Sequence, residues 1–474
     1  MVRDTRVLDD GTTLELVNLL DQTVNKLYGA TPDALQNALA HDRLVTISGE
    51  FAVAMLALDR TRHIVFRGAR TIGVPARVAR QTLTSTHKRL IVAHTIREIR
   101  EAWERDLPAG IEPVKEFSPS YTAMFPAFRA VTIHPWAWDA EWETTWFLPG
   151  PEYAPYPLPN LLPADLGVIG ARLIEALKRV ITDQLALIPD GEPIMVSFSG
   201  GADSTSVLVT LLETIRSLSR TNRVVGLTLA IDGGGSDLAQ AEKVASVLAV
   251  RFPEPAFAFR PLVVASDPAT TADLQTDAAL LLEEYHARDV ECGMAGMLLG
   301  WGATRAREEG ELPEIRFEFN GDGGNELFCD YPREDEGYSR IALDEVLANP
   351  FLYFLGHAPG THHHSSVFSD GLSRAYTRTI NPARANGVTT FSPFIDRHMV
   401  DLGQRLPLVE FARIGADLHA LRPEAVRLGL KQVYGIDLPA FPKARFQEGC
   451  SSDPSLLRVT REDSLRLRQL VLHP

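Results

Sequence analysis

The segment IMVSFSGGADSTSVLVTLLETIRS, residues 194–217, limits the fold of this chain more than any other stretch. Its first residues, 194–198, are mostly apolar and predict a buried strand, and the apolar spacing from about 204 to 217 predicts a helix. Gly200 and Gly201 separate the two. A strand that enters a helix through a short turn is the building unit of a parallel sheet with helices on its faces.

The second half of the chain repeats this alternation of predicted strands and helices. Short apolar runs predict the strands, and apolar residues at helical spacing predict the helices between them. We therefore expect an α/β fold with a parallel sheet covered on both faces, followed by a mostly helical region over 338–474. The further predicted strands are 224–230, 261–264 and 315–319, and the predicted helices are 165–187, 237–249, 272–286 and 292–307.

The N-terminal part of the chain has a different pattern. Residues 12–39 carry apolar residues at helical spacing, which predicts a helix. Residues 44–68 alternate and are rich in β-branched residues, so they predict strands joined by the polar turn at 59–62. Residues 88–94 predict another strand. Together these elements predict a small α+β domain.

A proline-rich stretch separates the two patterns. Residues 147–167 contain six prolines, which are incompatible with a continuous helix. We place the domain boundary there, which gives one domain over 1–150 and a second over 151–474.

Composition narrows the class of protein. The 474 residues carry a net charge of −14, which argues against a broad surface that follows nucleic-acid phosphates. The three cysteines, Cys292, Cys329 and Cys450, form no CxxC pair, which disfavours a disulfide framework or zinc knuckle and fits a reducing compartment. No run reaches the roughly 18 apolar residues of a membrane span. We expect a cytoplasmic protein with no membrane or nucleic-acid partner, and we leave a homodimer open.

The glycine turn after residue 198 has the composition of a phosphate-binding loop. Backbone N–H groups at a helix start have no partner within the helix, and the helix dipole adds partial positive charge. Glycines let an anion approach the backbone closely, and Asp203 suits a Mg²⁺ ion that bridges phosphate oxygens. The spacing fits neither Walker A nor GxGxxG, and the alternative is a plain flexible connection. The predicted phosphate-contacting residues are Ser197, Ser199, Gly200, Gly201, Asp203, Ser204 and Thr205.

A second segment also has a predicted strand followed by a glycine-rich loop. IRFEFNGDGGNELFCDYP, residues 315–332, is a predicted strand followed by a glycine-rich acidic loop. We expect Gly321 and Gly323 to contact the same ligand, and Asp322 and Glu326 to be candidate partners of a metal or an amine. Taken alone, this loop favours a solvated acidic turn, and the two loops together are the more specific signal.

The pair of loops resembles a known family. SGGADS resembles the SGGxDS PP-loop of ATP pyrophosphatases, which cleave ATP between its α and β phosphates. Followed by a loop similar to GxGxDE more than a hundred residues later, it resembles the synthetase domain of the asparagine synthetase family. FSPFIDRHMVDLGQRLP, residues 391–407, also resembles a helical segment of that family, through Phe394, Asp396 and Leu406.

The resemblance extends into the N-terminal half. GEFAVAML (49–56) looks like a strand of that family's glutaminase domain, and TWFLPG (145–150) sits where the two domains join. The resemblance implies a PP-loop synthetase domain over 151–474, with a helical C-terminal region, after an α+β Ntn-hydrolase-like domain over 1–150. Glutaminases of this family attack glutamine with a Cys after the initiator Met. Residue 2 here is Val, so the resemblance implies a truncated, inactive glutaminase-like domain.

One C-terminal segment points to a branch of the family that uses a ready-made amine. FPKARFQEGCSSDPSL, residues 441–456, resembles a segment of β-lactam synthetase, which with carbapenam synthetase joins a substrate's own amine to its adenylated carboxylate. The resemblance implies that Lys443 stabilises the acyl transition state, because a cation suits the negative charge that develops on oxygen. Glu448 would shape this loop next to the substrate.

Several positions depart from that branch. Asp322 stands where the family has a tyrosine that helps deprotonate the amine, and Arg374 falls near the partner glutamate. Arginine cannot act as a base because its guanidinium stays protonated. Asp322 is therefore the candidate base, with Tyr376 as a second candidate. Asn325 stands where the family has a Mg²⁺-binding Asp, and Glu326 is the residue that would compensate.

Two more segments lie near the family's ligand sites. IDGGGSD, residues 231–237, falls near the adenine and ribose site, which implicates Ile231 and Asp232; the alternative is a plain turn. Asp289 and Glu291 fall near the position of the substrate, to which we also assign Arg374 and Glu448. For Asp289 and Glu291 the alternative is a solvated helix start.

The resemblance implies an ATP-dependent amide synthetase that forms AMP and pyrophosphate in specialised-metabolite biosynthesis. It would use ATP and Mg²⁺, and join a small-molecule or peptide carboxylate to an amine within one molecule or between two. A lasso-type peptide macrolactam cyclase and a degenerate, non-catalytic ATP-binding partner protein are the alternatives. A PP-loop enzyme that modifies RNA fits the acidic charge less well.

Overall fold

The computed structural model describes residues 2–20, 26–28, 48–50, 52–56, 63–67, 77–105, 107, 109–112, 115–124, 129–133, 143–146, 161–266, 268–283, 285, 287–328, 374–440, 449–453 and 455–472. The chain forms two compact units. Unit 1 comprises Met1–Tyr153 with two short later segments, Phe368–Ser373 and Leu472–Pro474. Unit 2 comprises Ala154–Val367 and Arg374–Val471.

The described part of unit 1 is built mainly from β-strands. One five-stranded sheet has the order β1-β2-β8-β7-β9, in which β2 and β8 are parallel. A four-stranded antiparallel sheet has the order β11-β10-β6-β5, and β3 pairs with β4. Helix α2 (Ile96–Arg105) packs on β7 and β8, and a short 3₁₀ helix, η2, spans Pro119–Tyr121. The strands are β1 Val2–Val7, β2 Thr13–Asn18, β3 Lys26–Tyr28, β4 Ser48–Glu50, β5 Ala52–Leu56, β6 His63–Arg67, β7 Arg77–Thr84, β8 His87–Ala93, β9 Thr122–Met124, β10 Arg129–Ile133 and β11 Glu143–Trp146.

The predicted helix over 12–39 is wrong where the structure describes this segment. Thr13–Asn18 is strand β2, which lies between β1 and β8, and Lys26–Tyr28 is strand β3. Four consecutive residues of β2 are buried because the strand has a neighbour on each side and packs on both faces. A strand that is buried on both faces does not alternate between apolar and polar residues as a half-buried strand does. The apolar spacing of this segment therefore suggested a helix. The strands predicted within 44–68 and at 88–94 are confirmed as β4, β5, β6 and β8.

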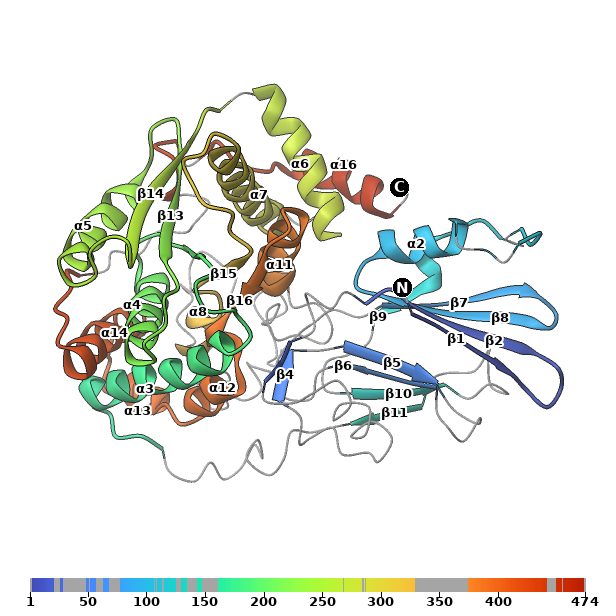
Figure 1. Cartoon of the computed structure of the whole chain (residues 1–474), viewed down its shortest axis with the longest axis horizontal. Coiled ribbons are helices and arrows are strands. Elements are labelled where there is room, and N and C mark those ends of the chain that lie inside the picture. The colour runs from blue at the N-terminus through green and yellow to red at the C-terminus, as the bar shows by residue number, and fades with distance from the viewer. Residues whose placement is uncertain are drawn as a thin grey trace. The chain divides into compact units, whose positions relative to one another are not determined.

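Unit 2 contains a five-stranded parallel sheet with the order β14-β13-β12-β15-β16 (Figure 1). Its first strand in sequence, β12, lies at the centre; the chain first adds β13 and β14 on one side and later adds β15 and β16 on the other. At such a reversal of strand order, the loops after neighbouring strands diverge and leave room for a ligand. The strands are β12 Ile194–Ser197, β13 Val224–Ile231, β14 Phe257–Val264, β15 Phe317–Phe319 and β16 Thr389–Phe391.

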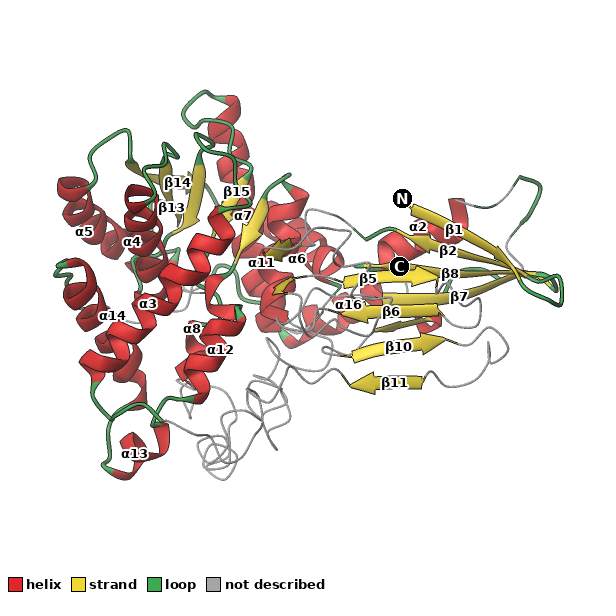
Figure 2. Ribbon diagram, turned by 60° about the horizontal axis from the view of Figure 1, so that its bottom comes forward, coloured by secondary structure: helices red, strands yellow, loops and turns green. Residues whose placement is uncertain are grey.

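Helices cover both faces of this sheet (Figure 2). Helices α4 and α5 pack on one face, with α3 and α14 outside α4, and α7 packs on the other face, with α6 and α11 next to it. The predicted parallel α/β sheet with helices is therefore confirmed. The helices are α3 Leu166–Leu185, α4 Ala202–Ser217, α5 Ser236–Arg251, α6 Pro268–Leu282, α7 Ala287–Glu308, α8 Gly324–Phe328, α11 Arg374–Ala385, α12 Arg397–Gln404, α13 Leu408–Arg413, α14 Leu418–Tyr434 and α16 Arg461–Leu472, with the 3₁₀ helix η6 at Pro393–Ile395.

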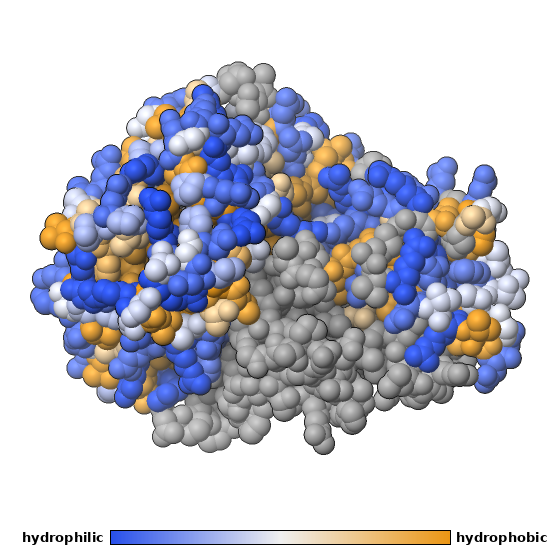
Figure 3. All heavy atoms as spheres, viewed as in Figure 1, coloured by the Kyte–Doolittle hydropathy of each residue, from blue (hydrophilic) through white to orange (hydrophobic). Residues whose placement is uncertain are grey.

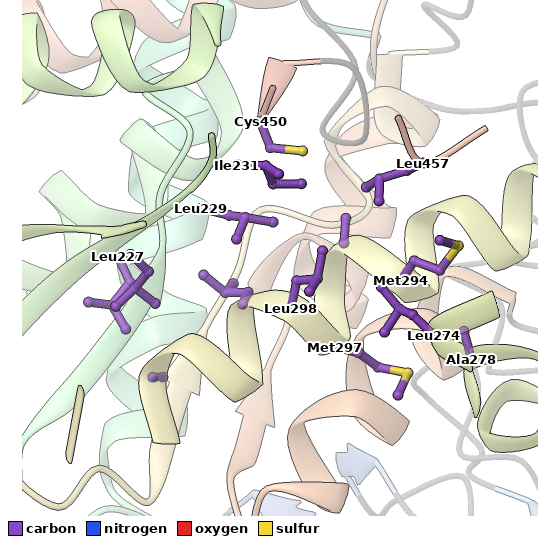
Figure 4. Close-up of a cluster of buried hydrophobic side chains, with 14 of the residues drawn as sticks. Leu227, Leu229, Ile231, Leu274, Ala278, Met294, Met297, Leu298, Cys450 and Leu457 are labelled. Carbon is purple, nitrogen blue, oxygen red and sulfur yellow. The ribbon is translucent and has the colours of Figure 1, made fainter. Parts of the chain in front are cut away.

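A large hydrophobic cluster fills the space between the sheet and α7 (Figure 4). Alternate residues of β13, Leu227, Leu229 and Ile231, belong to this cluster, as do Met294 and Leu298 of α7. Cys450 lies beside Ile231 in the same cluster, so the C-terminal part of the chain contributes to this core. Each fully buried side chain of this size contributes about 1.5–3 kcal/mol relative to exposure.

On the face of unit 2 that Figure 3 shows, hydrophobic residues lie scattered among hydrophilic ones. Among the described helices, none is long and apolar enough to cross a membrane.

Candidate functional site

The first glycine loop lies between β12 and α4, at the carboxyl end of the central strand. Gly200 has a φ of +72°, and a Cβ placed on it would lie 2.5 Å from the backbone nitrogen of Ala241 in α5. Only glycine fits at this position because both the backbone conformation and the space exclude a side chain. Gly201 is the N-cap of α4, with no side-chain cap, so the first-turn N–H groups of a 16-residue helix face the loop.

The hydroxyl groups of this loop fall into two sets. Ser199 and Ser204 lie in the loop itself, where Ser204 Oγ accepts a hydrogen bond from the Ser199 backbone nitrogen at 3.3 Å. Thr205 is completely buried, and Ser197 donates a hydrogen bond to the carboxylate of Glu318 in β15. The structure thus places Thr205 inside the fold, whereas Ser197 is partly exposed and is bound to the neighbouring strand.

The second glycine loop packs directly on the first. A Cβ on Gly321 would lie 2.7 Å from the Ser204 backbone nitrogen, and one on Gly324 would lie 2.2 Å from Asp203 Oδ1. Gly323 has a φ of +100° at the turn before α8. Two loops more than 100 residues apart in sequence are therefore in van der Waals contact, which requires the absence of side chains on the second loop. The structure brings together the two loops that the sequence singled out.

Arg422 joins the two loops, and the sequence analysis missed it. Its side chain, 4% exposed, extends from α14 and forms an ion pair with Asp203. Its Nη2 also donates a hydrogen bond to Asn325 Oδ1 at 2.6 Å. The sequence did carry one signal for this residue. Arg422 lies next to Leu421 and one helical turn before Ala425 and Val426, and these three apolar residues are buried. An arginine on such an apolar helix face needs a buried acceptor.

This arrangement does not fit a resident Mg²⁺ ion on the two predicted metal ligands. A guanidinium already binds one carboxylate oxygen of Asp203, Oδ2, and the amide oxygen of Asn325. Among the residues that the structure describes, no group of three or more His, Cys, Asp and Glu could hold a metal ion. Mg²⁺ prefers carboxylate and phosphate oxygens, whereas Asn325 supplies a neutral amide. In this structure Asp203 and Asn325 thus both bind the guanidinium of Arg422, where the sequence predicted metal ligands.

Asp322 is held in place by helix α11. Its carboxylate accepts a hydrogen bond from Thr379, and its backbone nitrogen donates to Asn320 Oδ1 at 3.0 Å. Arg374 and Tyr376 belong to the first turn of the same helix, and Glu326 belongs to α8, but their side chains lie outside the description.

The loop after β13 is tied to two other segments. Asp232, at φ +52°, accepts a hydrogen bond from the Ser266 backbone nitrogen at 2.8 Å and another from the Ser266 hydroxyl, which together lower the pKa of its carboxyl. The backbone nitrogen of Ile231 donates to the Cys450 carbonyl at 2.8 Å. The side chain of Asp232 and the N–H of Ile231 thus have partners within the protein, where we predicted contacts to adenine or ribose.

The C-terminal segment is anchored on the start of α5 at two points. Gln240 Nε2 donates to the Ala440 carbonyl at 3.2 Å, and a Cβ on Gly449 would lie 2.1 Å from Asp237 Oδ1. Burial raises the pKa of Asp237 to about 7. Gly200 also packs on α5, so both anchors are on the helix that supports the first glycine loop. The candidate residues Lys443 and Glu448 lie outside the described residues.

The two acidic residues predicted for substrate binding lie in the first half of α7. Glu291 Oε1 accepts a hydrogen bond from the Val459 backbone nitrogen at 2.9 Å, which ties α7 to the C-terminal segment. Asp289 is buried, with 5% exposure. The predicted alternative of a solvated helix start is therefore wrong for Asp289, and Glu291 has at least a structural role.

Comparison with known proteins gives structural likenesses alone. No model of a known protein family matches the chain. No curated protein matches it either. Among solved structures, the chain is similar to the U34-tRNA thiolase NcsA from Methanococcus maripaludis, at 12% identity and a TM-score of 0.21, over 64% of this chain and 80% of that one. It is also similar to the NAD⁺ synthetase from Burkholderia pseudomallei, at 14% identity and a TM-score of 0.21, over 65% of this chain and 94% of that one.

Proposed function

We propose that this chain is an ATP-dependent amide synthetase that forms AMP and pyrophosphate. A substrate carboxylate oxygen attacks the α-phosphorus of ATP, the bond to the bridging oxygen breaks, and pyrophosphate leaves. An amine nitrogen then attacks the carbonyl carbon of the acyl-adenylate, and AMP leaves with the pair of electrons from the broken C–O bond. Activation is required because oxide is too poor a leaving group for an amine to displace from a carboxylate.

The observation that carries this proposal is the contact between the two glycine loops. Each follows one of two neighbouring strands, β12 and β15, at their carboxyl ends, where open parallel sheets bind ligands. The first loop supplies N–H groups at the start of α4, which suit phosphate oxygens. The second lies against it through Gly321 and Gly324 and presents Asp322. Groups that suit phosphate oxygens and a carboxylate that suits proton transfer thus lie at the same edge of the sheet, which supports the proposal.

We assign the proton transfer to Asp322. Thr379 fixes its carboxylate, which a base needs in order to remove a proton from an ammonium group in one geometry. Positioning the amine against the adenylate supplies about 7–11 kcal/mol of the barrier reduction. We assign stabilisation of the acyl oxyanion to Lys443, with Tyr376 and Arg374 near the substrate. We also propose that unit 1 is an inactive glutaminase-like domain.

A non-catalytic ATP-binding protein is the second candidate, and the Arg422 contacts favour it. A guanidinium on Asp203 and Asn325 leaves the loop without the resident metal that an adenylating enzyme of this type would use. Closure of a peptide macrolactam is a variant of the first candidate, because it needs the same two chemical steps.

Release of pyrophosphate separates these candidates. The purified chain is incubated with MgATP and a panel of amino-acid and peptide carboxylates, and pyrophosphate is measured with and without each compound. We expect at least one carboxylate to increase the release. The mass of the product then distinguishes ring closure, which removes water from one substrate, from the joining of two. Nucleotide binding without release for any carboxylate would favour the non-catalytic candidate.

Lys443→Ala tests the second step separately. We expect this variant to retain carboxylate-dependent pyrophosphate release and to lose most amide formation, because Lys443 is assigned to the acyl transfer. Lys431→Ala is the matched control, since Lys431 is an exposed lysine that pairs with Asp437 at 2.9 Å. Equal amide formation by the two variants would remove Lys443 from the mechanism.

A further inference from the structure

We propose that the guanidinium of Arg422, in place of a resident metal ion on Asp203 and Asn325, is the fixed cation of the phosphate-binding loops. This inference rests on the proposed function, because it names the cation that holds the two loops to which we assign the polyphosphate of ATP. Under this proposal, magnesium reaches the site only with the nucleotide, as part of the substrate.

The first argument is the geometry of the guanidinium. Nη1 binds Asp203 in the first turn of α4, and Nη2 binds Asn325 in α8. A planar guanidinium can bind two acceptors at once with fixed directions, which an ammonium or a hydrated ion does not. Arg422 therefore holds both loops together through one rigid group.

The second argument is charge. Asp203 and Asn325 together carry one negative charge, which one guanidinium balances. A divalent cation shared with these two side chains would have to displace the guanidinium or lie next to it, and two positive groups at close range repel. An aspartate at position 325 would add the second negative charge that a metal ion needs. The neutral amide at 325 and the arginine at 422 are therefore matched to each other.

The third argument is that the position of Arg422 is built into the packing of α14. Gly429 comes seven residues after Arg422, which puts the two residues on the same side of the helix. Gly429 lies against Gly170 of α3, because a Cβ on Gly429 would be 2.2 Å from the Gly170 carbonyl oxygen. A Cβ on Gly170 would in turn be 2.0 Å from the Ala425 carbonyl oxygen. This close helix contact fixes where α14 runs and hence where the guanidinium lies relative to α4.

Two measurements test the proposal, and the first needs no nucleotide. Binding of Mn²⁺ to the protein alone is followed by electron paramagnetic resonance. We expect no stoichiometric uptake by the wild type and stoichiometric uptake by the double variant Arg422→Gln/Asn325→Asp, which offers two carboxylates without the guanidinium. Stoichiometric uptake by the wild type that Asp203→Asn removes would overturn the proposal.

The second measurement is the affinity for ATP by equilibrium dialysis, in excess Mg²⁺ and in excess EDTA. We expect the wild type to bind ATP in both, and Arg422→Gln to bind about 10- to 100-fold more weakly in EDTA, which is typical of a lost charge-assisted hydrogen bond. Arg422→Lys keeps the charge and serves if Arg422→Gln does not fold; we expect an intermediate loss.

Arg427→Gln is the matched control on the same helix, because Arg427 pairs with Glu424 at 2.6 Å and lies near Asp437. It should bind ATP like the wild type. ATP binding that needs Mg²⁺ in the wild type and is unchanged by the Arg422 variants would overturn the inference and leave the proposed function standing. If the wild type binds no ATP in either condition, the proposed function fails, and this inference fails with it.

Discussion

Gly200→Ala is the substitution for which the structure gives the clearest quantitative expectation. The backbone of Gly200 has a φ of +72°, a conformation that costs a residue with a side chain about 1–2 kcal/mol. The added Cβ would lie 2.5 Å from Ala241 N and 2.6 Å from Gln240 C, both backbone atoms of α5. Ordinary contact begins at 3.4 Å, so the loop or the helix must move by about 1 Å, which is a typical overpacking distortion.

The expected loss of unfolding free energy follows from these two terms. Overpacking adds about 1–3 kcal/mol to the backbone cost, for a total of about 2–5 kcal/mol. Gly233→Ala is the matched control: Gly233 has a φ of +91° in the neighbouring loop, and a Cβ there meets no atom within 4 Å. It should cost only the backbone term of about 1–2 kcal/mol. Gly201→Ala, with a φ of −71° and Ser199 Oγ at 3.3 Å, should cost less than Gly200→Ala.

Urea unfolding followed by far-ultraviolet circular dichroism measures these differences. The signal reports mainly on unit 2, because α2 is the one α-helix in the described part of unit 1. Pyrophosphate release by the folded variants gives the functional effect, and a shift of 1 Å in the loop should lower it by about 100-fold for Gly200→Ala. Equal midpoints for Gly200→Ala and Gly233→Ala would show that the contact with α5 does not constrain the loop, and the reasoning would fail.

Three further substitutions test other contacts. Gly170→Ala should destabilise unit 2 by about 1–3 kcal/mol, because the new Cβ would push on the Ala425 carbonyl oxygen; an unchanged urea midpoint would contradict the close helix contact. Thr379→Val should reduce amide formation by about tenfold and leave pyrophosphate release unchanged, because Asp322 loses a hydrogen bond that orients it; equal effects on both steps would contradict its role in the second. For Asp237, burial raises the pKa from 3.8 to about 7, so the folded state binds the proton more tightly than the unfolded state. The unfolding free energy of the wild type should therefore fall, relative to Asp237→Asn, as the pH rises from about 4 to about 7; a constant difference between the two proteins across this range would refute the raised pKa.

The sequence predicted those elements of unit 2 that are determined by residues close to one another along the chain. Strand β12, the two glycines and helix α4 follow from one short segment, because period, turn chemistry and helix start all lie within it. Contacts between distant segments could not be predicted in this way. Arg422 reaches Asp203 only because α14 packs on α3 and α4, and no spacing rule places α14 there.

The dependence on distant contacts also explains which strands the sequence analysis missed or misassigned. Strand β16, only three residues long, exists because β15 offers it an edge, and its own sequence carries too few residues to mark a strand. Strand β2 was mistaken for part of a helix because four of its residues in a row are buried by packing on the two faces of the sheet. In each case a partner from elsewhere in the chain decided the outcome.

The attachment of the C-terminal segment to α5 has a consequence for the order of events during synthesis. Gln240 and Ala440 are 200 residues apart, and a ribosome that adds about 5–20 residues per second needs about 10–40 s to make that length. The sheet strands β12, β13 and β14 can therefore emerge and associate well before Ala440 exists. During this interval Ala440 and Gly449 do not yet contact the start of α5. A chaperone or a ligand can therefore reach a surface of the nascent chain that is buried in the finished protein.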